Sequence, residues 1–321
     1  MSTILGQGDF RYLELPDWGR LPDGWSYREV AGVAIDSRDN VFVFNRGRHP
    51  VIVFDKDGNF LRSFGEDVIT RAHGIDIGPD DTIYLTDDES HSVKVYDVEG
   101  RPRFTIGLPG QRSPYMSGLP FHLCTHTALS PQGEIYVADG YGNARVHKYS
   151  PDGRLMFSWG EPGTDPGQFN IVHNICTDDA GYVYVADREN HRIQVFAPDG
   201  RFETQWHNLH RPCGLTMTGG SHALCYIGEL GPAMDVNRKV PNIGPRLSIA
   251  APDGRVLARI GETPGGETPG RFVAPHGVAV DSHGDIYVGE VSATVLAVAG
   301  DLIAEPRAPR SLRKLVKLPA E

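Results

Sequence analysis

The feature that most constrains this chain is a motif of four short strands that recurs along it. Its clearest copy runs from His173 to Trp206 and reads HNICTDDAGYVYVADRENHRIQVFAPDGRFETQW. Runs of alternating apolar and polar residues, separated by turns that contain Gly and Asp, predict four antiparallel strands. One such sheet cannot bury both of its faces, so the copies must pack against one another. The sequence therefore predicts an array of similar sheets.

Six copies of the motif follow one another. The glycines of the third turn recur at intervals of 42 to 54 residues in the first five copies, at Gly58, Gly100, Gly153, Gly200 and Gly254. This interval is typical of a four-stranded propeller blade. We therefore predict an all-β fold, namely a six-bladed β-propeller of four-stranded antiparallel blades. A closed array of this size is commonly one domain, so residues 1–321 are expected to form a single propeller domain.

The sixth copy, His276 to Gly300, lacks a clear final strand. Ring closure removes unpaired sheet edges, so a terminal segment is expected to complete this blade. The sequence offers two candidates, Phe10–Leu15 and Leu312–Leu318, and does not choose between them. Taken alone, the basic cluster from Arg307 to Lys317 indicates an exposed edge strand or tail.

Charge and composition limit the partners. The net charge is −10 and the pI is about 5.7, which disfavours nucleic acid and anionic membranes. The first residues, MSTILGQGDFRYLEL, lack the basic and apolar regions of a signal peptide, and no stretch is long enough to span a membrane. The four cysteines lack CxxC spacing. These features favour a cytoplasmic protein with reduced thiols and leave the oligomeric state open.

Histidines occupy alternate blades at one position of the repeat. Where the innermost strand begins, the six copies carry Ala31, His73, Thr125, His173, Cys213 and His276. Alternate blades of a six-fold ring are about 120° apart, so the three imidazoles are expected to meet near the axis. Three histidines with open coordination positions are typical of a catalytic metal site. Zinc is the first choice, with iron or manganese as alternatives.

The second strand of each blade ends at the same mouth of the channel. In blades one, three and four this position carries Arg46, Tyr141 and Arg188. Two arginines would bind an anionic substrate, and a tyrosine would transfer a proton. His122 and His126 flank the start of blade three and are further candidates for substrate contact, while the role of Cys213 stays open.

Three long connections are expected at this mouth, where they would roof the site. They are Leu108–Cys124, Leu230–Pro245 and Glu262–Pro275.

The repeats resemble the NHL repeat over about residues 32–300. The segment from Asp139 to Phe196 further resembles the catalytic core of peptidyl-α-hydroxyglycine α-amidating lyase (peptidylamidoglycolate lyase). That resemblance implies a six-bladed propeller that cleaves the N–Cα bond of a C-terminal α-hydroxyglycine. It also implies a zinc ion held by His73, His173 and His276, with the active-site tyrosine at Tyr141 and the two active-site arginines at Arg46 and Arg188.

The chain departs from this family at two positions beside the third histidine. The family's structural calcium uses an aspartate where this chain has Gly277, which leaves a structural Ca²⁺ site in doubt, and a family methionine is replaced by Ala274. We therefore predict a metal-dependent lyase that cleaves the C–N bond of an α-hydroxy amide, or of a related small carboxylate-bearing substrate. The substrate would be a small molecule or a peptide end. The alternatives are a metal-dependent hydrolase of an ester, lactone or amide, and a non-catalytic NHL interaction platform.

Overall fold

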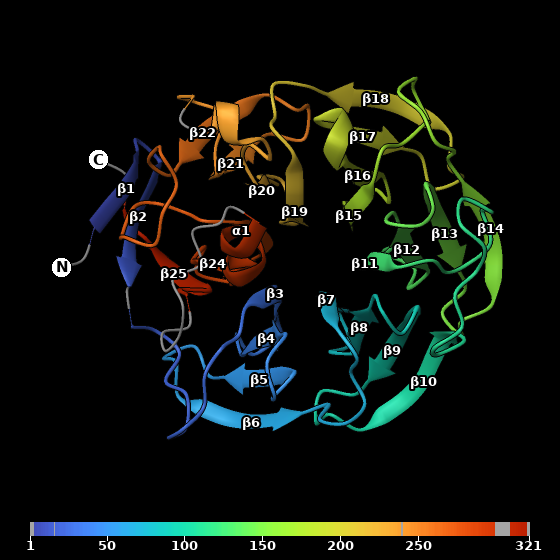
Figure 1. Ribbon diagram of the computed structural model, residues 1–321, viewed down its shortest axis with the longest axis horizontal. Coiled ribbons are helices and arrows are strands. Elements are labelled where there is room, and N and C mark those ends of the chain that lie inside the picture. Colours follow the sequence, from blue (N-terminus) through green and yellow to red (C-terminus); the bar gives the residue numbers. More distant parts are fainter. Residues whose placement is uncertain (1–2, 16, 239, 299–308, 320–321) are drawn as a thin grey trace.

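The computed structural model describes residues 3–15, 17–238, 240–298 and 309–319. Within these ranges the chain forms six antiparallel β-sheets arranged around a central axis (Figure 1). The predicted all-β class and six-bladed β-propeller are confirmed. No helix in the described ranges is both long and apolar enough to cross a membrane.

Each of the first five blades contains four strands that follow the chain from the axis to the rim. The blades are β3–β6 (Val30–Ile35, Val41–Asn45, Val51–Phe54, Phe60–Phe64), β7–β10 (Ala72–Ile77, Ile83–Asp87, Ser92–Tyr96, Pro102–Gly107), β11–β14 (Cys124–Leu129, Ile135–Asp139, Arg145–Tyr149, Leu155–Trp159), β15–β18 (Val172–Thr177, Val183–Asp187, Arg192–Phe196, Phe202–Trp206) and β19–β22 (Pro212–Met217, Cys225–Glu229, Arg246–Ala250, Val256–Ile260).

The sixth sheet joins the two ends of the chain. Its order from the axis is β23 (Pro275–Val280), β24 (Ile286–Glu290), β25 (Leu312–Lys317), β2 (Phe10–Leu15) and β1 (Thr3–Gln7). Both candidate terminal segments therefore enter this blade. The interpretation of the basic cluster as an exposed edge or tail is wrong for its described part, because β25 pairs with a strand on each side and buries Leu312 and Leu315. Arg307 lies outside the described residues.

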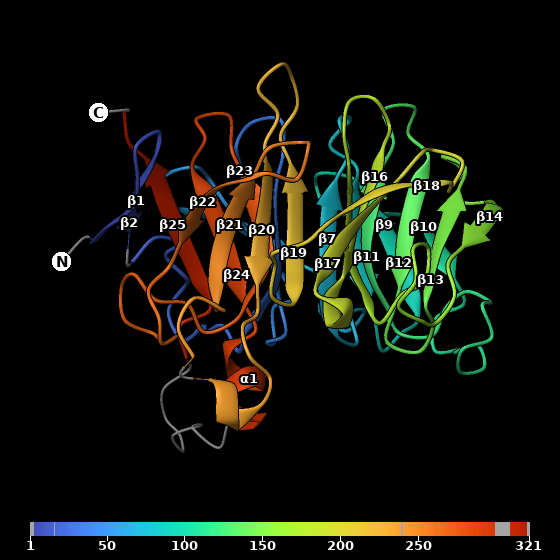
Figure 2. The ribbon, with the colours of Figure 1, turned by 90° about the horizontal axis from the view of Figure 1, so that it is seen from above.

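A short helix, α1 (Ser292–Val298), follows β24 and projects from one face of the ring (Figure 2). The sequence predicted a degenerate strand region here, ending at Gly300, which lies outside the described residues. The third place in the sheet is taken by β25, so this segment is not needed for pairing and coils into a helix. Two 3₁₀ turns, η1 (Arg188–Asn190) and η2 (Asp235–Asn237), complete the described elements.

Every innermost strand has a β-bulge at its second residue. The pairing register breaks on either side of residues 31, 73, 125, 173, 213 and 276. A bulge leaves its residue out of the ladder and re-aims the side chain. The repeat position that carries the three histidines is therefore the bulge position in all six blades.

Acidic side chains at the ends of the second strands fix the connections that lead into this layer. Asp87 accepts a hydrogen bond from the N–H of Thr70 at 2.8 Å, and Asp187 accepts one from the N–H of Asn170 at 2.7 Å. Both carboxylates are fully buried. Because each one ties the incoming chain to its own blade, the start of the innermost strand is held rigidly at the channel mouth.

Candidate active site

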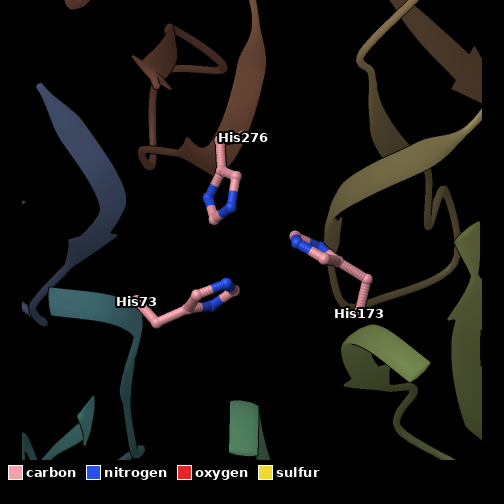
Figure 3. A group of neighbouring side chains, drawn as sticks. All are labelled: His73, His173 and His276. Atoms are coloured by element: carbon pink, nitrogen blue, oxygen red, sulfur yellow. The ribbon is translucent and has the colours of Figure 1, made fainter. Parts of the chain in front are cut away.

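Three histidines from blades two, four and six meet at the propeller axis. The rings of His73, His173 and His276 are directed toward a common point (Figure 3). One ligand atom from each ring lies within 4.8 Å of the others, and all three residues are buried. Among the residues that the structure describes, no other group of three or more His, Cys, Asp or Glu side chains could hold a metal ion. The convergence predicted from alternate blades is thus present.

A backbone carbonyl orients each ring. Nδ1 of His73 lies 2.6 Å from the carbonyl oxygen of Thr125, and Nδ1 of His276 lies 2.6 Å from that of Ala31. Nδ1 of His173 lies 2.9 Å from the carbonyl oxygen of Cys213. A carbonyl oxygen can only accept, so Nδ1 carries the proton and Nε2 keeps its lone pair. Each histidine is therefore held by the bulge residue of the next blade.

The electrostatics favour the form of histidine that binds metal. Burial lowers the pKa of each of the three imidazoles well below its ordinary value. The charges of Arg46 and Arg188 act in the same direction, as do the neighbouring imidazoles. All three rings are consequently neutral at neutral pH, so no proton has to leave before a metal ion binds.

The donor set fits zinc better than calcium. Zn–N distances of about 2.1 Å place tetrahedral donors about 3.4 Å apart, so small side-chain movements would bring the three nitrogens into position. Calcium requires oxygen ligands, and position 277 has no space for a carboxylate. A Cβ added at Gly277 would lie 2.7 Å from Cα of Gly32.

Tyr141 lies directly beside two of the histidines. Its hydroxyl oxygen is 3.2 Å from Nε2 of His73, 3.1 Å from Nε2 of His173 and 3.3 Å from Nη1 of Arg188. The preceding Gly140 makes this approach possible, because a Cβ there would lie 1.9 Å from the carbonyl oxygen of Val172. The tyrosine hydroxyl is thus within hydrogen-bonding reach of two of the three histidines and of one arginine.

Both predicted arginines lie at the same mouth. Arg188 donates from Nε to Glu189 at 2.7 Å, and its guanidinium lies 5.4 Å from the centre of the Tyr141 ring. Arg46 donates from Nε to the carbonyl oxygen of Ala72 and from Nη1 to Glu29, each at 2.8 Å. In both arginines Nη2 has no partner within the described part of the chain, so each retains a donor for a ligand.

A cavity of about 250 Å³ opens over this centre. Tyr141, His276, Thr294, five arginines and six aliphatic residues line it. The arginines are Arg46, Arg71, Arg188, Arg211 and Arg238, and the aliphatic residues are Leu230, Pro232, Ala233, Val291, Val295 and Val298. A cavity of this charge would accept an anion that also carries apolar surface.

The three remaining candidates do not line this cavity. The ring of His122 bonds the carbonyl oxygen of Ser113 at 2.7 Å, and His126 lines a separate cavity deeper in the channel. The thiol of Cys213 lies 3.3 Å from Nδ1 of His173, but burial raises its pKa to about 12. It is therefore a neutral thiol that packs against the histidine. All four cysteines are free and buried.

Sequence reasoning missed several parts of the site. It did not single out Glu29 and Glu189, which hold the two arginines, or the further arginines at positions 71, 211 and 238. It placed three long connections over the site, but only Leu230–Pro245 contributes to the cavity lining, through residues 230, 232, 233 and 238. None of the lining residues comes from Leu108–Cys124 or Glu262–Pro275. The helix α1 was not foreseen. The only sign of it in the sequence was that SATVLAV lacks the alternation of apolar and polar residues that a half-buried strand shows.

Comparisons with known proteins define the class first. The NHL repeat family matches residues 169–196, in blade four. The chain also shares a fold with the streptogramin B lyase structure, with a TM-score of 0.57 over 91% of this chain and 95% of that chain. Their sequences are only 13% identical, so this likeness concerns the fold alone. The chain is thus a six-bladed β-propeller that contains an NHL repeat.

Individual relatives make the similarity more specific. The chain is 37% identical over 189 residues to NHL repeat-containing protein 3 of Homo sapiens, covering 55% of this chain and 54% of that protein. It is 30% identical over 311 residues to peptidyl-glycine alpha-amidating monooxygenase B of Xenopus laevis, covering 84% of this chain and 33% of that protein. It is 32% identical over 164 residues to peptidyl-alpha-hydroxyglycine alpha-amidating lyase 1 of Drosophila melanogaster, covering 47% of this chain and 30% of that protein.

These matches confirm the predicted resemblance to NHL propellers and to proteins named amidating lyases. The chain spans about half the length of NHL repeat-containing protein 3 and about a third of the other two proteins. The similarity therefore covers only part of each of those proteins.

Proposed function

We propose that this protein is a metal-dependent lyase that cleaves the C–N bond of an α-hydroxy amide bearing a carboxylate. The observation that carries the proposal is the meeting of three neutral imidazoles with one tyrosine hydroxyl, beside a cavity that His276, Tyr141 and the two arginines line. The relatives named amidating lyases support a lyase of this kind.

His73, His173 and His276 would hold the metal, with zinc as the first choice and iron or manganese as alternatives. A bound zinc ion would supply Lewis acidity, which lowers the pKa of a hydroxyl group. The Nδ1 bonds to the three carbonyls keep the rings in the required tautomer and orientation.

The arginines bind and orient the substrate. A carboxylate is planar and accepts two parallel N–H donors, which is the geometry that a guanidinium offers. Nη2 of Arg46 and Nη2 of Arg188 are the donors that the protein itself leaves available. Binding between them would place the reacting carbon next to Tyr141 and fix the C–N bond for cleavage.

Tyr141 moves the proton. Its oxygen accepts the proton of the substrate hydroxyl while its own phenolic proton passes to the amide nitrogen, as the C–N bond breaks. The electron pair of the O–H bond becomes the second bond of a carbonyl group, and the C–N pair leaves with the nitrogen. An α-hydroxyglycine derivative would therefore give an amide and glyoxylate, with no net uptake of water or protons.

A direct test is to load the purified protein with zinc and supply N-benzoyl-α-hydroxyglycine. We expect benzamide and glyoxylate in equal amounts, and about one equivalent of bound metal. Less than about half an equivalent of any transition metal, in protein prepared without chelator, would refute the metal-dependent proposal and favour a non-catalytic platform. Turnover of an ester or lactone panel, with none of the carbinolamide, would assign the site to a hydrolase instead.

A further inference from the structure

Glu29 connects the candidate substrate-binding arginine to the roof of the cavity. This carboxylate is 3% exposed. Its Oε1 atom accepts a hydrogen bond from Nη1 of Arg46 at 2.8 Å and one from the hydroxyl of Thr294 at 2.7 Å. Its Oε2 atom accepts a bond from the N–H of Thr294 at 2.7 Å. Thr294 belongs to α1, so one side chain holds both the arginine and the helix.

The carboxylate is ionised in this position. Burial alone would raise its pKa, but Arg46 and the bonds from Thr294 outweigh that effect, and the pKa lies below the ordinary value. All three hydrogen bonds are therefore bonds to a charged acceptor, which are stronger than neutral ones. Loss of the charge would weaken the attachment of Arg46 and of α1 together.

Two cavities adjoin Arg46 and Thr294, although the Arg46 side chain itself is only 8% exposed. The 250 Å³ cavity lies on one side of Arg46 and Thr294, and a second cavity of about 330 Å³, lined by Glu29, Arg46, Arg71 and Thr294, adjoins them. Because hollows border the guanidinium on two sides, its hydrogen bonds help to fix its orientation. The bonds to Glu29 and to the Ala72 carbonyl provide that constraint.

The second arginine shows the same arrangement with different residues. Glu189 accepts from Nε of Arg188 at 2.7 Å and from Nη2 of Arg211 at 2.8 Å. Arg211 in turn donates to the carbonyl oxygen of Gly231, at 3.3 Å, in the connection that forms the other part of the roof. Each predicted substrate arginine is thus joined to one roof segment through one carboxylate.

We propose that Glu29 is a positioning residue that couples binding of the substrate carboxylate at Arg46 to closure of α1 over the cavity. This inference rests on the proposed function, because it takes Arg46 as a carboxylate-binding group. Correct orientation of Nη2 toward the ligand requires Nη1 to be held by Glu29. A ligand that fixes Arg46 would in return strengthen the attachment of Thr294 to the same carboxylate.

Binding of N-acetylglycine to the zinc-loaded protein tests the coupling without turnover. This probe has the carboxylate and the amide of the substrate but lacks the hydroxyl. Calorimetry would give its affinity, and hydrogen exchange of the amides of residues 292–298 would report on α1. In the unaltered protein we expect the probe to slow exchange in α1.

The Glu29→Gln variant distinguishes positioning from simple charge effects. If Glu29 only offset the charge of Arg46, removing it would strengthen binding of an anion. The positioning role predicts the opposite, a loss of about tenfold in affinity, together with faster exchange in α1 that N-acetylglycine no longer slows. Equal or tighter binding, or unchanged exchange in α1, would overturn the proposal.

Three further variants complete the experiment. Thr294→Val should speed exchange in α1 while changing the affinity less than Glu29→Gln does, because the Glu29–Arg46 pair remains. Glu29→Asp, which keeps the charge but shortens its reach, applies the same test if Glu29→Gln fails to fold. Glu134→Gln, whose partner Lys148 lies away from the cavity, is the control and should change neither readout.

The outcomes separate this inference from the proposed function. If the unaltered protein does not bind N-acetylglycine, the substrate assignment fails and the carboxylate half of the coupling fails with it. If that protein binds the probe and Glu29→Gln binds it equally well, only the role of Glu29 is overturned.

Discussion

The hydroxyl oxygen of Tyr141 lies 3.1 Å from Nε2 of His173. These two residues come from adjacent blades and are 32 positions apart in the chain. Their contact places a proton-transfer group beside an imidazole whose lone pair is directed to the axis. The tyrosine and the three histidines therefore belong to one site. From there the tyrosine is in position to act on a substrate hydroxyl.

Replacement of Tyr141 by Phe should separate metal binding from chemistry. The substitution removes one oxygen and leaves the imidazoles and their carbonyl partners in place. We expect metal content to stay at about one equivalent and kcat to fall by about 10² to 10⁴, the usual contribution of a general acid–base group. Metal analysis and steady-state rates on the same preparation provide the check. An unchanged kcat would exclude Tyr141 from proton transfer.

Replacement of His173 by Ala should abolish metal binding. Two imidazoles remain, which is fewer than the three protein ligands of a typical catalytic zinc site. We expect elemental analysis to find little metal, and the melting temperature to lose its increase on zinc addition, because a ligand stabilises only the state that binds it. His122→Ala is the matched control, since His122 lies outside the cavity. Full metal occupancy in His173→Ala would contradict the ligand assignment.

The fold and the convergence of the three histidines could be predicted because both follow from the repeats along the chain. A strand motif at regular intervals fixes the number of blades, and alternation of His73, His173 and His276 over alternate blades fixes their convergence. The bulge that re-aims these residues was not visible, because a bulge depends on backbone pairing and not on residue type.

The surroundings of the site were less predictable because they do not repeat. Glu29 precedes the first repeat and reaches Arg46 only through the fold. The interior position of β25 depends on pairing with β2, about 300 residues away in sequence. Local composition showed a basic cluster and could not show the acids, Glu14 and Glu290, that Arg313 contacts in the closed ring.

Arg313 should be essential for ring stability. It is 1% exposed and pairs with Glu14 of β2 at 2.8 Å and with Glu290 of β24. Arg313→Met would leave two buried carboxylates without this cation, and removing one partner of a buried ion pair typically costs about 3–5 kcal/mol. Urea denaturation would measure the loss. Arg154→Met, at an exposed pair with Asp152, should change the stability by less than about 0.5 kcal/mol.

Asp76 is a half-buried acid in the channel, three residues after His73. One oxygen accepts the N–H of Ile77 at 3.0 Å, and the side chain lines a cavity of about 220 Å³ together with His126 and Asn174. Burial raises the pKa of Asp76 to about 7. The folded protein therefore retains a proton on Asp76 at pH values where the unfolded chain has released it. The contribution of Asp76 to stability therefore falls as pH rises from about 4 to about 7.

The Asp76→Asn substitution should remove this pH dependence. Asparagine keeps the acceptor for the Ile77 N–H but cannot ionise. Wild-type Asp76 lowers the free energy of unfolding as pH rises, and the variant should not show this decrease. We expect the variant to be more stable than wild type, by a margin that widens by about 2–3 kcal/mol between pH 5 and pH 8. Urea denaturation at both pH values measures the margin, and Asp23→Asn at an exposed position is the control. A margin that stays constant across this range would show that Asp76 is ionised in the folded channel.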